Sequence, residues 1–138
     1  MMFVETSAIV AILAGEADAD AYLSAIDSAT DRQTGAHVRL EATINLARIL
    51  GLEVLDAQEM FDAFLHAAKI AVIPITDAIA RHAVEAFAVY GKGERPSRPL
   101  NFADCLSYAC AKTQNMPILF KGHDFTETDL RSALFGES

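Results

Sequence analysis

Short apolar runs alternate with longer segments of helical periodicity along this chain, and this alternation restricts its fold more than any other feature. Apolar runs at 3–4, 71–75 and 117–120, with a weaker one at 34–36, predict strands. Between them, helical spacing of apolar side chains predicts helices at about 8–13, 18–29, 37–50, 56–68 and 77–90, and after Asn101. A final short helix is expected after Gly122. Such an order favours right-handed crossovers and a parallel α/β sheet with helices on both faces.

Local signals predict where several of these elements begin and end. Polar residues that can cap a helix precede four of the helices, at Asp56, at Thr76 or Asp77, at Asn101 and at Thr126. A hydroxyl at Thr6 or Ser7 is expected to open the first helix. Gly51 predicts the end of the helix from about His37, and Pro74 indicates that the strand at 71–75 lies at a sheet edge.

Length and composition predict one well-packed domain over residues 1–138. Hydrophobic residues make up 52% of the chain and charged residues 22%, which favours a filled core over disorder. The apolar opening segment carries Glu5, lacks a basic region and is too short to cross a bilayer, so we expect no membrane association. Cys105 and Cys110 match no metal or redox spacing and are expected to be reduced packing residues of a cytoplasmic protein.

Four acidic residues occur where apolar runs give way to polar ones: Glu5, Glu41, Asp104 and Asp124. A buried carboxylate is costly unless it is paired, hydrogen-bonded or bound to a metal. Sites in parallel α/β sheets form beyond the carboxyl ends of the strands, where Glu5 and Asp124 are both expected. If the four converge, they predict a site for a hard divalent cation, Mg²⁺ or Mn²⁺, since no histidine pair has a zinc spacing.

Each of these residues also has a purely structural interpretation. Glu5 can bond the N–H groups of the helix that follows it, and Asp104 can complete a capping box with Asn101. Glu41 lies on a polar helix face with His37, Asn45 and Arg48, and such faces are usually only solvated. An Asx turn explains Asp124 equally well. We expect Asp129 to complete a capping box with Thr126, and the basic loop of Lys92, Arg95 and Arg98 to serve either solubility or recognition.

The net charge of −8 counts against binding nucleic acid through a general basic surface. Bound divalent cations could offset the acidic cluster, or a basic partner could cover it.

Three stretches of the chain resemble the PIN domain, and specifically the VapC-type toxins of type II toxin–antitoxin pairs, including their FitB-like branch. The stretches are Phe3-Val-Glu-Thr-Ser-Ala-Ile-Val-Ala-Ile-Leu13, Leu100-Asn-Phe-Ala-Asp-Cys105 and Leu119-Phe-Lys-Gly-His-Asp-Phe-Thr-Glu-Thr-Asp-Leu130, with Glu41 between them. The resemblance implies a three-layer α/β/α PIN-like fold with a central parallel sheet of four or five strands. It also implies an endoribonuclease that cleaves tRNA or other structured RNA.

The resemblance assigns roles to individual residues. Glu5, Glu41, Asp104 and Asp124 would form an acidic quartet that holds Mg²⁺ or Mn²⁺, with Thr6, Ser7 and Asn101 in support. A metal-activated water would attack phosphorus, leaving a 5′-phosphate and a 3′-OH. The implied partners are a VapB-type antitoxin, a second toxin in a homodimer and higher assembly, and operator DNA through the antitoxin alone. One departure is Glu5, because the family mostly has the shorter Asp there.

Three other functions stay open on the sequence alone. A PIN scaffold with weak or no catalysis could act mainly by binding its antitoxin, and Glu5 is the best argument for it. A metal-dependent phosphatase would use similar carboxylates. A receiver-like signalling module is also α/β, but it requires an acidic pair near the first strand, where Glu5 is single.

Overall fold

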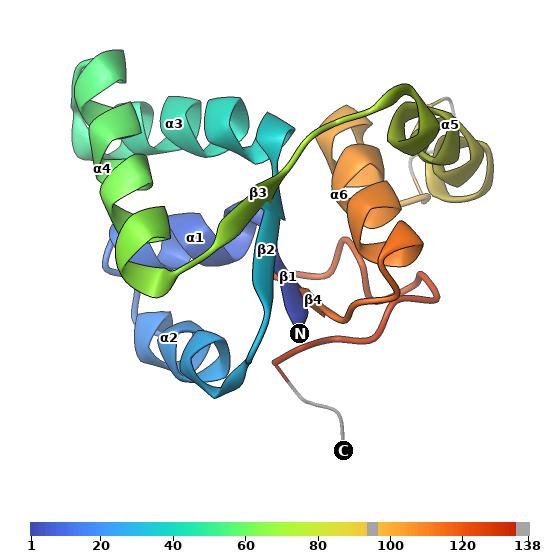
Figure 1. Ribbon diagram of the computed structural model, residues 1–138. Helices are drawn as coiled ribbons and strands as arrows, with labels where there is room; N and C mark the ends of the chain where they lie inside the picture. Colours follow the sequence, from blue (N-terminus) through green and yellow to red (C-terminus); the bar gives the residue numbers. More distant parts are fainter. Residues whose placement is uncertain (94–96, 135–138) are drawn as a thin grey trace.

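A four-stranded parallel sheet forms the centre of the molecule (Figure 1). The computed structural model describes residues 1–93 and 97–134. The strands are β1 Met2–Val4, β2 Arg32–Gly35, β3 Ala71–Ile73 and β4 Ile118–Leu119. Their order across the sheet is β3-β2-β1-β4, and every neighbouring pair is parallel. The predicted parallel sheet is confirmed, with four strands.

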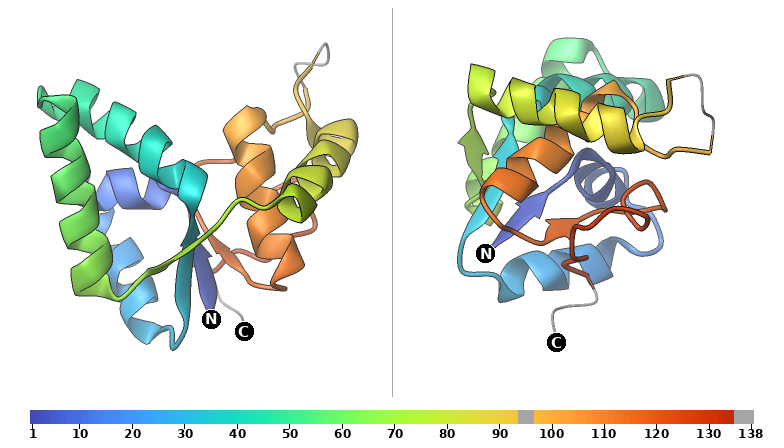
Figure 2. Two further views of the ribbon diagram at one scale, coloured as in Figure 1. Left: turned by 45° about the horizontal axis from the view of Figure 1, so that its top comes forward. Right: turned by 90° about the vertical axis from the view of Figure 1, so that its right-hand side faces the viewer.

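Helices cover both faces of this sheet, as predicted (Figures 1 and 2). One layer contains α1 Thr6–Leu13, α2 Ala19–Ser28, α3 Ala36–Leu50 and α4 Val54–Ala68. The opposite layer contains α5 Asp77–Tyr90 and α6 Phe102–Thr113. Figure 2 separates the two helical layers, with the sheet between them.

The strands differ in burial, and the β3 edge of the sheet is more exposed than the β4 edge. All three residues of the central strand β1 are buried, and so are both residues of β4. In β3 only Ile73 is buried, while Ala71 and Val72 are exposed. That pattern fits an edge strand, so the interpretation of Pro74 as an edge signal is confirmed.

Most of the predicted helix ends are confirmed, but the predicted start of α4 is wrong. Thr76 caps α5 through Ile79 N–H, and Gly51 ends α3 with a left-handed φ of 66°. By contrast, α4 begins at Val54, so Asp56 is not its cap. Asp56 instead lies in the first turn, where its negative charge is favourable near the partial positive charge of the helix N-terminus.

The short helix predicted after Gly122 does not form, and residues 121–129 make turns instead. The Thr126 hydroxyl donates to the carbonyl of His123, and the Thr128 hydroxyl donates to that of Phe125. These local bonds close single turns rather than capping a helix. Asp129 is structural as expected, but its partners are the Tyr108 hydroxyl and the Lys112 ammonium on α6.

The loop predicted at 91–100 is held by contacts to backbone groups. Gly91 pairs with Leu100, and the Arg98 guanidinium donates to Ala88 O. Arg95 lies outside the described residues.

No helix within the described ranges is both long and apolar enough to cross a membrane. Cys105 and Cys110 are buried and unpaired, as predicted.

Candidate active site

The four acidic residues singled out in the sequence line one cavity of about 430 Å³. Glu5 directly follows β1 and Asp124 lies in the segment after β4, while Glu41 comes from α3 and Asp104 from α6. The cavity therefore lies beyond the carboxyl ends of the adjacent strands β1 and β4, and parallel sheets place their sites at this end of the strands. Thr6, Ser7 and Asn101 also line it, so all seven predicted site residues are brought together.

Glu5 is only 4% exposed, and it caps the helix that follows while also lining the cavity. Its Oε1 accepts hydrogen bonds from the backbone N–H of Ser7 at 2.9 Å and from the Ser7 hydroxyl at 2.5 Å. The carboxylate itself thus caps α1, and the expectation of a hydroxyl cap was wrong. Burial raises the pKa of Glu5 to about 8, with the charges of Asp104 and Glu41 adding to the rise and the Ser7 bonds opposing it.

Glu41 is joined to α1 by a hydrogen bond from the Thr6 hydroxyl at 2.5 Å. Its helix face is not simply solvated, because Asn45 and Arg48 line the same cavity. His37, the fourth residue of that face, contacts α6 instead: its Nε2 lies 2.8 Å from Ser107 Oγ. The polar face of α3 is therefore a wall of the site.

Asp104 is buried and forms the predicted capping box. Its backbone N–H donates to the Asn101 side chain at 2.8 Å, and the Asn101 N–H donates to Asp104 Oδ2 at 3.1 Å. The pKa of Asp104 is raised to about 7, mainly by burial and also by the charges of Asp124 and Glu41, while the Asn101 bond and Lys92 act in the opposite direction. Asp104 therefore caps α6 and lines the cavity at once.

The segment that carries Asp124 is held against the site by its neighbours. The backbone N–H of Lys121 donates to Ser7 Oγ at 2.7 Å, which joins the end of β4 to the start of α1. Phe125 is buried and packs edge-on against Phe120, with ring centroids 5.3 Å apart. These contacts keep Asp124 beside the cavity without a helix.

Two cationic side chains line the cavity that the sequence had not singled out as site residues. Arg48 donates to Asn45 on its own helix. The ammonium of Lys121 forms ion pairs with Glu16 and Asp18. The helical spacing from Glu41 to Asn45 and Arg48 could have indicated the first of these, but no sequence signal connects Lys121 with Glu16, which lies 105 residues earlier.

The donors in this cavity fit a hard cation in kind. All four acidic side chains offer oxygen ligands, which Mg²⁺ and Mn²⁺ prefer. The carboxylates lie close enough that their charges raise the pKa values of Glu5 and Asp104. Across residues 1–93 and 97–134, no three His, Cys, Asp or Glu side chains form a complete metal centre. Coordination would therefore need the carboxylates to rotate toward one another.

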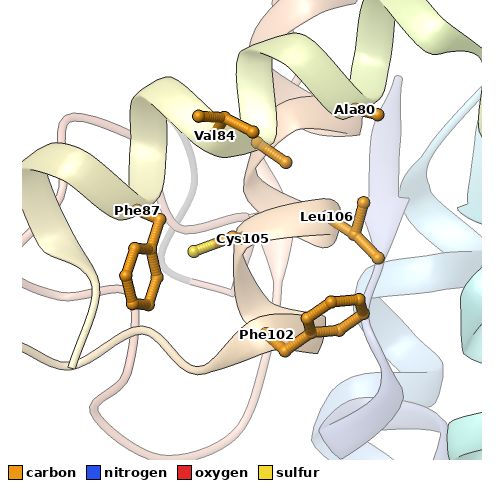
Figure 3. Close-up of a pocket in the computed structure, with 7 residues that line it drawn as sticks. Ala80, Val84, Phe87, Phe102, Cys105 and Leu106 are labelled. Carbon is orange, nitrogen blue, oxygen red and sulfur yellow. The ribbon is translucent and has the colours of Figure 1, made fainter. Parts of the chain in front are cut away.

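A second cavity, between α5 and α6, has a different character (Figure 3). It measures about 390 Å³, and its lining consists of Ala80, Ala83, Val84, Phe87, Phe102, Cys105 and Leu106. Burial raises the pKa of the Cys105 thiol to about 11, with a contribution from Asp104, so it is protonated at neutral pH. This apolar groove has no group that could carry out acid–base or nucleophilic chemistry.

Comparisons with known sequences identify the family. The profile described as the PIN domain matches residues 2–130. Ribonuclease VapC28 of Mycobacterium tuberculosis is 40% identical over 139 residues, which cover 96% of this chain and 98% of that protein. Ribonuclease VapC30 of the same organism is 35% identical over 133 residues, covering 94% of this chain and 95% of that one. The chain therefore belongs to the PIN domain family.

Within that family the chain is a ribonuclease of the VapC type, the toxin component of a toxin–antitoxin pair. Solved structures agree in fold. Mycobacterium tuberculosis VapC20, described as a sarcin–ricin loop cleaving toxin, superposes with a TM-score of 0.76 at 22% identity, covering 94% of this chain and 96% of that one. A toxin–antitoxin complex from Klebsiella pneumoniae gives a TM-score of 0.68 at 14% identity, covering 94% and 93%.

Proposed function

We propose that this chain is an Mg²⁺- or Mn²⁺-dependent endoribonuclease and that the cavity of Glu5, Glu41, Asp104 and Asp124 is its active site. The observation that carries the proposal is the convergence of these four carboxylates from β1, α3, α6 and the segment after β4 on one cavity. The elements that carry these carboxylates pack on a hydrophobic core around the sheet. We therefore assign residues 1–138 to one PIN domain.

The carboxylates are proposed to hold the cation, and the neighbouring polar groups to orient them. Ser7 fixes one oxygen of Glu5, Thr6 fixes Glu41, and Asn101 fixes Asp104. When bound, the cation supplies activation of the attacking water and neutralisation of charge on the leaving oxygen. Arg48 and Lys121, which also line the cavity, are suited to contact the phosphates on either side of the scissile bond.

The substrate is proposed to be a structured RNA such as tRNA or an exposed RNA loop. VapC20 is described as cleaving the sarcin–ricin loop, which is consistent with a loop target. The net charge of −8 counts against holding the RNA through a broad basic surface. Recognition is therefore proposed to depend on the cavity and its two cations once the carboxylates are neutralised.

Chelation with product analysis tests this function. Cleavage of a tRNA pool should stop in excess EDTA and return with added Mg²⁺ or Mn²⁺, and the products should carry 5′-phosphate and 3′-OH ends. These ends distinguish attack by water from attack by the ribose 2′-OH, which leaves a cyclic phosphate. Undiminished cleavage in EDTA, or cyclic phosphate ends, would contradict the proposed chemistry.

The first proposed partner is a VapB-type antitoxin, through which the chain would reach operator DNA. A solved toxin–antitoxin complex of the same fold supports such a partner. A basic antitoxin segment would complement the acidic cavity and block RNA. Co-expression with the adjacent reading frame should give a complex whose RNA cleavage is suppressed, and two proteins that purify separately would contradict this.

The second proposed partner is another copy of the chain, bound through the α5–α6 groove. Phe102 is 82% exposed beside the groove, and Val84 and Phe87 are also exposed on its rim (Figure 3). A twofold axis would let each Phe102 contact the partner's groove, giving a self-complementary apolar interface. Sedimentation should show a dimer that Val84→Asp converts to a monomer.

We place the protein in the cytoplasm, where two buried free thiols are stable.

A catalytically weak scaffold is the second candidate, because Glu5 replaces the family's Asp and no three described carboxylates form a complete metal centre. Titration with Mn²⁺ separates the two functions. The enzyme should bind the ion with saturable affinity, whereas the scaffold should not.

A further inference from the structure

His37 and Ser107 form a polar contact between the two helices that supply Glu41 and Asp104. His37 Nε2 lies 2.8 Å from Ser107 Oγ, and the two residues are 70 positions apart in the chain. His37 precedes Glu41 by one helical turn on α3, and Ser107 follows Asp104 by three residues on α6, so each lies on the same helix face as its carboxylate. The start of α3 lies beside α6 in Figure 1.

This contact is specific rather than incidental. Ser107 is fully buried, and His37 Nδ1 is buried with no hydrogen-bond partner among the described residues. Within residues 1–93 and 97–134, the bond to Ser107 is thus the one polar restraint on the imidazole ring. Burial lowers the pKa of His37 to about 4, so the ring is neutral at pH 7, with one nitrogen able to donate and the other to accept.

The chain makes room for the ring by placing a glycine two residues earlier. A Cβ at Gly35 would lie 2.5 Å from His37 Cε1, 2.6 Å from His37 Nδ1 and 3.3 Å from Cys110 Sγ. The φ of Gly35 is −97°, which any residue can adopt, so the glycine is required for space and not for backbone conformation. An alanine there would push the imidazole away from Ser107.

We propose that the His37–Ser107 hydrogen bond is a positioning element that fixes the separation of Glu41 and Asp104 across the acidic cavity. Its residues do not line the cavity and act only through the two carboxylates. A cluster that must close around one ion is sensitive to small displacements of its supports. Loss of a group bonded directly to a ligand typically costs about 10-fold to 100-fold in metal affinity or activity, and a bond that acts through the two helices should cost toward the lower end or less. The inference rests on the proposed function of that cavity.

Three variants remove the bond in different ways: Ser107→Ala, His37→Leu and Gly35→Ala. The third keeps both side chains and displaces only the ring, so it remains informative if a polar deletion in the core prevents folding. Each should weaken Mn²⁺ binding, measured by electron paramagnetic resonance on the folded protein, by up to about 10-fold. The RNA cleavage rate at saturating substrate should fall while KM for RNA stays unchanged.

Two further variants separate positioning from simple loss of stability. His37→Gln retains a polar group near the position of Nε2 and should recover affinity relative to His37→Leu. Thr43→Val is the matched control, because Thr43 is buried on the same helix and its hydroxyl has no partner in the described residues. It should leave Mn²⁺ affinity unchanged. The Ser107→Ala/His37→Leu double variant should be no worse than either single variant, since both remove one bond.

The outcomes distinguish this inference from the function on which it rests. If the wild type neither binds Mn²⁺ nor cleaves RNA, the proposed function fails and the positioning role fails with it. If the wild type does both, and Ser107→Ala and Gly35→Ala keep its affinity and rate while folded, the positioning role is overturned and the nuclease stands.

Discussion

The resemblance to VapC-type toxins implies that Glu5 stands where the family mostly has Asp, and the surroundings of Glu5 indicate adaptation rather than decay. Its Oε1 is fully engaged by the backbone and side chain of Ser7, while Oε2 has no hydrogen bond to any described residue. The longer arm therefore lets one oxygen cap α1 and leaves the other for the cavity. An aspartate in this backbone would be one methylene short of serving both purposes.

Glu5→Asp should accordingly weaken both Mg²⁺ binding and cleavage, by about 10-fold. Isothermal titration with Mg²⁺ and single-turnover cleavage of the two forms provide the measurement. A clear gain in either quantity would show that the longer side chain misplaces the ion and that the wild-type chain is a partly disabled nuclease.

Asp104→Asn should abolish cleavage without unfolding the protein. An amide oxygen can still accept the Asn101 N–H, so the capping box of α6 survives. Removing one of several neighbouring negative charges should leave thermal stability equal or higher. Cleavage assays and melting curves check both points. A variant that retains turnover, or one that simply unfolds, would return Asp104 to a purely capping role.

At the scale of residues, the sequence could indicate the acidic positions because each marks the end of an apolar run. It could not show that Thr6 bonds Glu41 across 35 positions or that Lys121 is paired with Glu16, because those contacts depend on tertiary packing. The solvated-face interpretation of Glu41 failed for the same reason. A polar helix face looks identical in sequence whether it faces bulk water or a cavity.

The segment after β4 is joined to α6 by a small hydrogen-bond network, which should contribute to the stability of the folded protein. The Tyr108 hydroxyl donates to Asp129 Oδ1 at 2.6 Å, and Lys112 contacts the other carboxylate oxygen at 2.7 Å. Tyr108→Phe should lower the free energy of unfolding by about 1.5 kcal/mol, which is the lower end of the range for a hydrogen bond to a charged group. Urea denaturation measures this, with Glu127→Gln at an exposed position of the same segment as a control. A loss no larger than that of the control would contradict the role given to the network.

At the scale of elements, strong local signals succeeded and ambiguous ones failed. Gly51, Thr76 and Asn101 each determine one helix end through their own backbone or side-chain chemistry. Gly51 and Asn101 were predicted directly, and Thr76 was one of two predicted alternatives. Asp56 failed because an acidic residue suits both the cap and the first turn. Thr126 failed because its hydroxyl can close a turn as easily as it can cap a helix.

The buried carboxyls should make the stability of the whole molecule depend on pH. Burial raises the pKa of Glu5 from 4.5 to about 8 and that of Asp104 from 3.8 to about 7. Between these limits the folded state holds protons that the unfolded state releases. The contribution of these two carboxyls to the free energy of unfolding is therefore fully present below about pH 4 and is lost as the pH rises toward 8.

Melting temperatures in EDTA should thus fall between about pH 5 and pH 8, and Mg²⁺ should raise them most at the upper end, where the carboxylates are ionised. The Asp104→Asn variant should show a shallower dependence on pH. A slope unchanged in that variant would show that other groups cause the dependence.

The overall architecture was the most predictable feature of this protein. Alternation of strands and helices, with short connections, leaves few parallel arrangements, and the sheet order β3-β2-β1-β4 is one of them. The separation of α3 from α6 was not predictable, because it depends on the contact of His37 with Ser107 and on the space left by Gly35. That separation determines how far apart the carboxylates on the two helices lie.

The central claim is that one cation binds among Glu5, Glu41, Asp104 and Asp124, and anomalous diffraction from Mn²⁺-soaked crystals tests it most directly. We predict an anomalous peak inside this cavity, with carboxylate oxygens from at least two of the four residues as ligands, and its absence in Asp104→Asn. A folded wild-type crystal with no peak in the cavity, or with the ion bound elsewhere, would contradict the account.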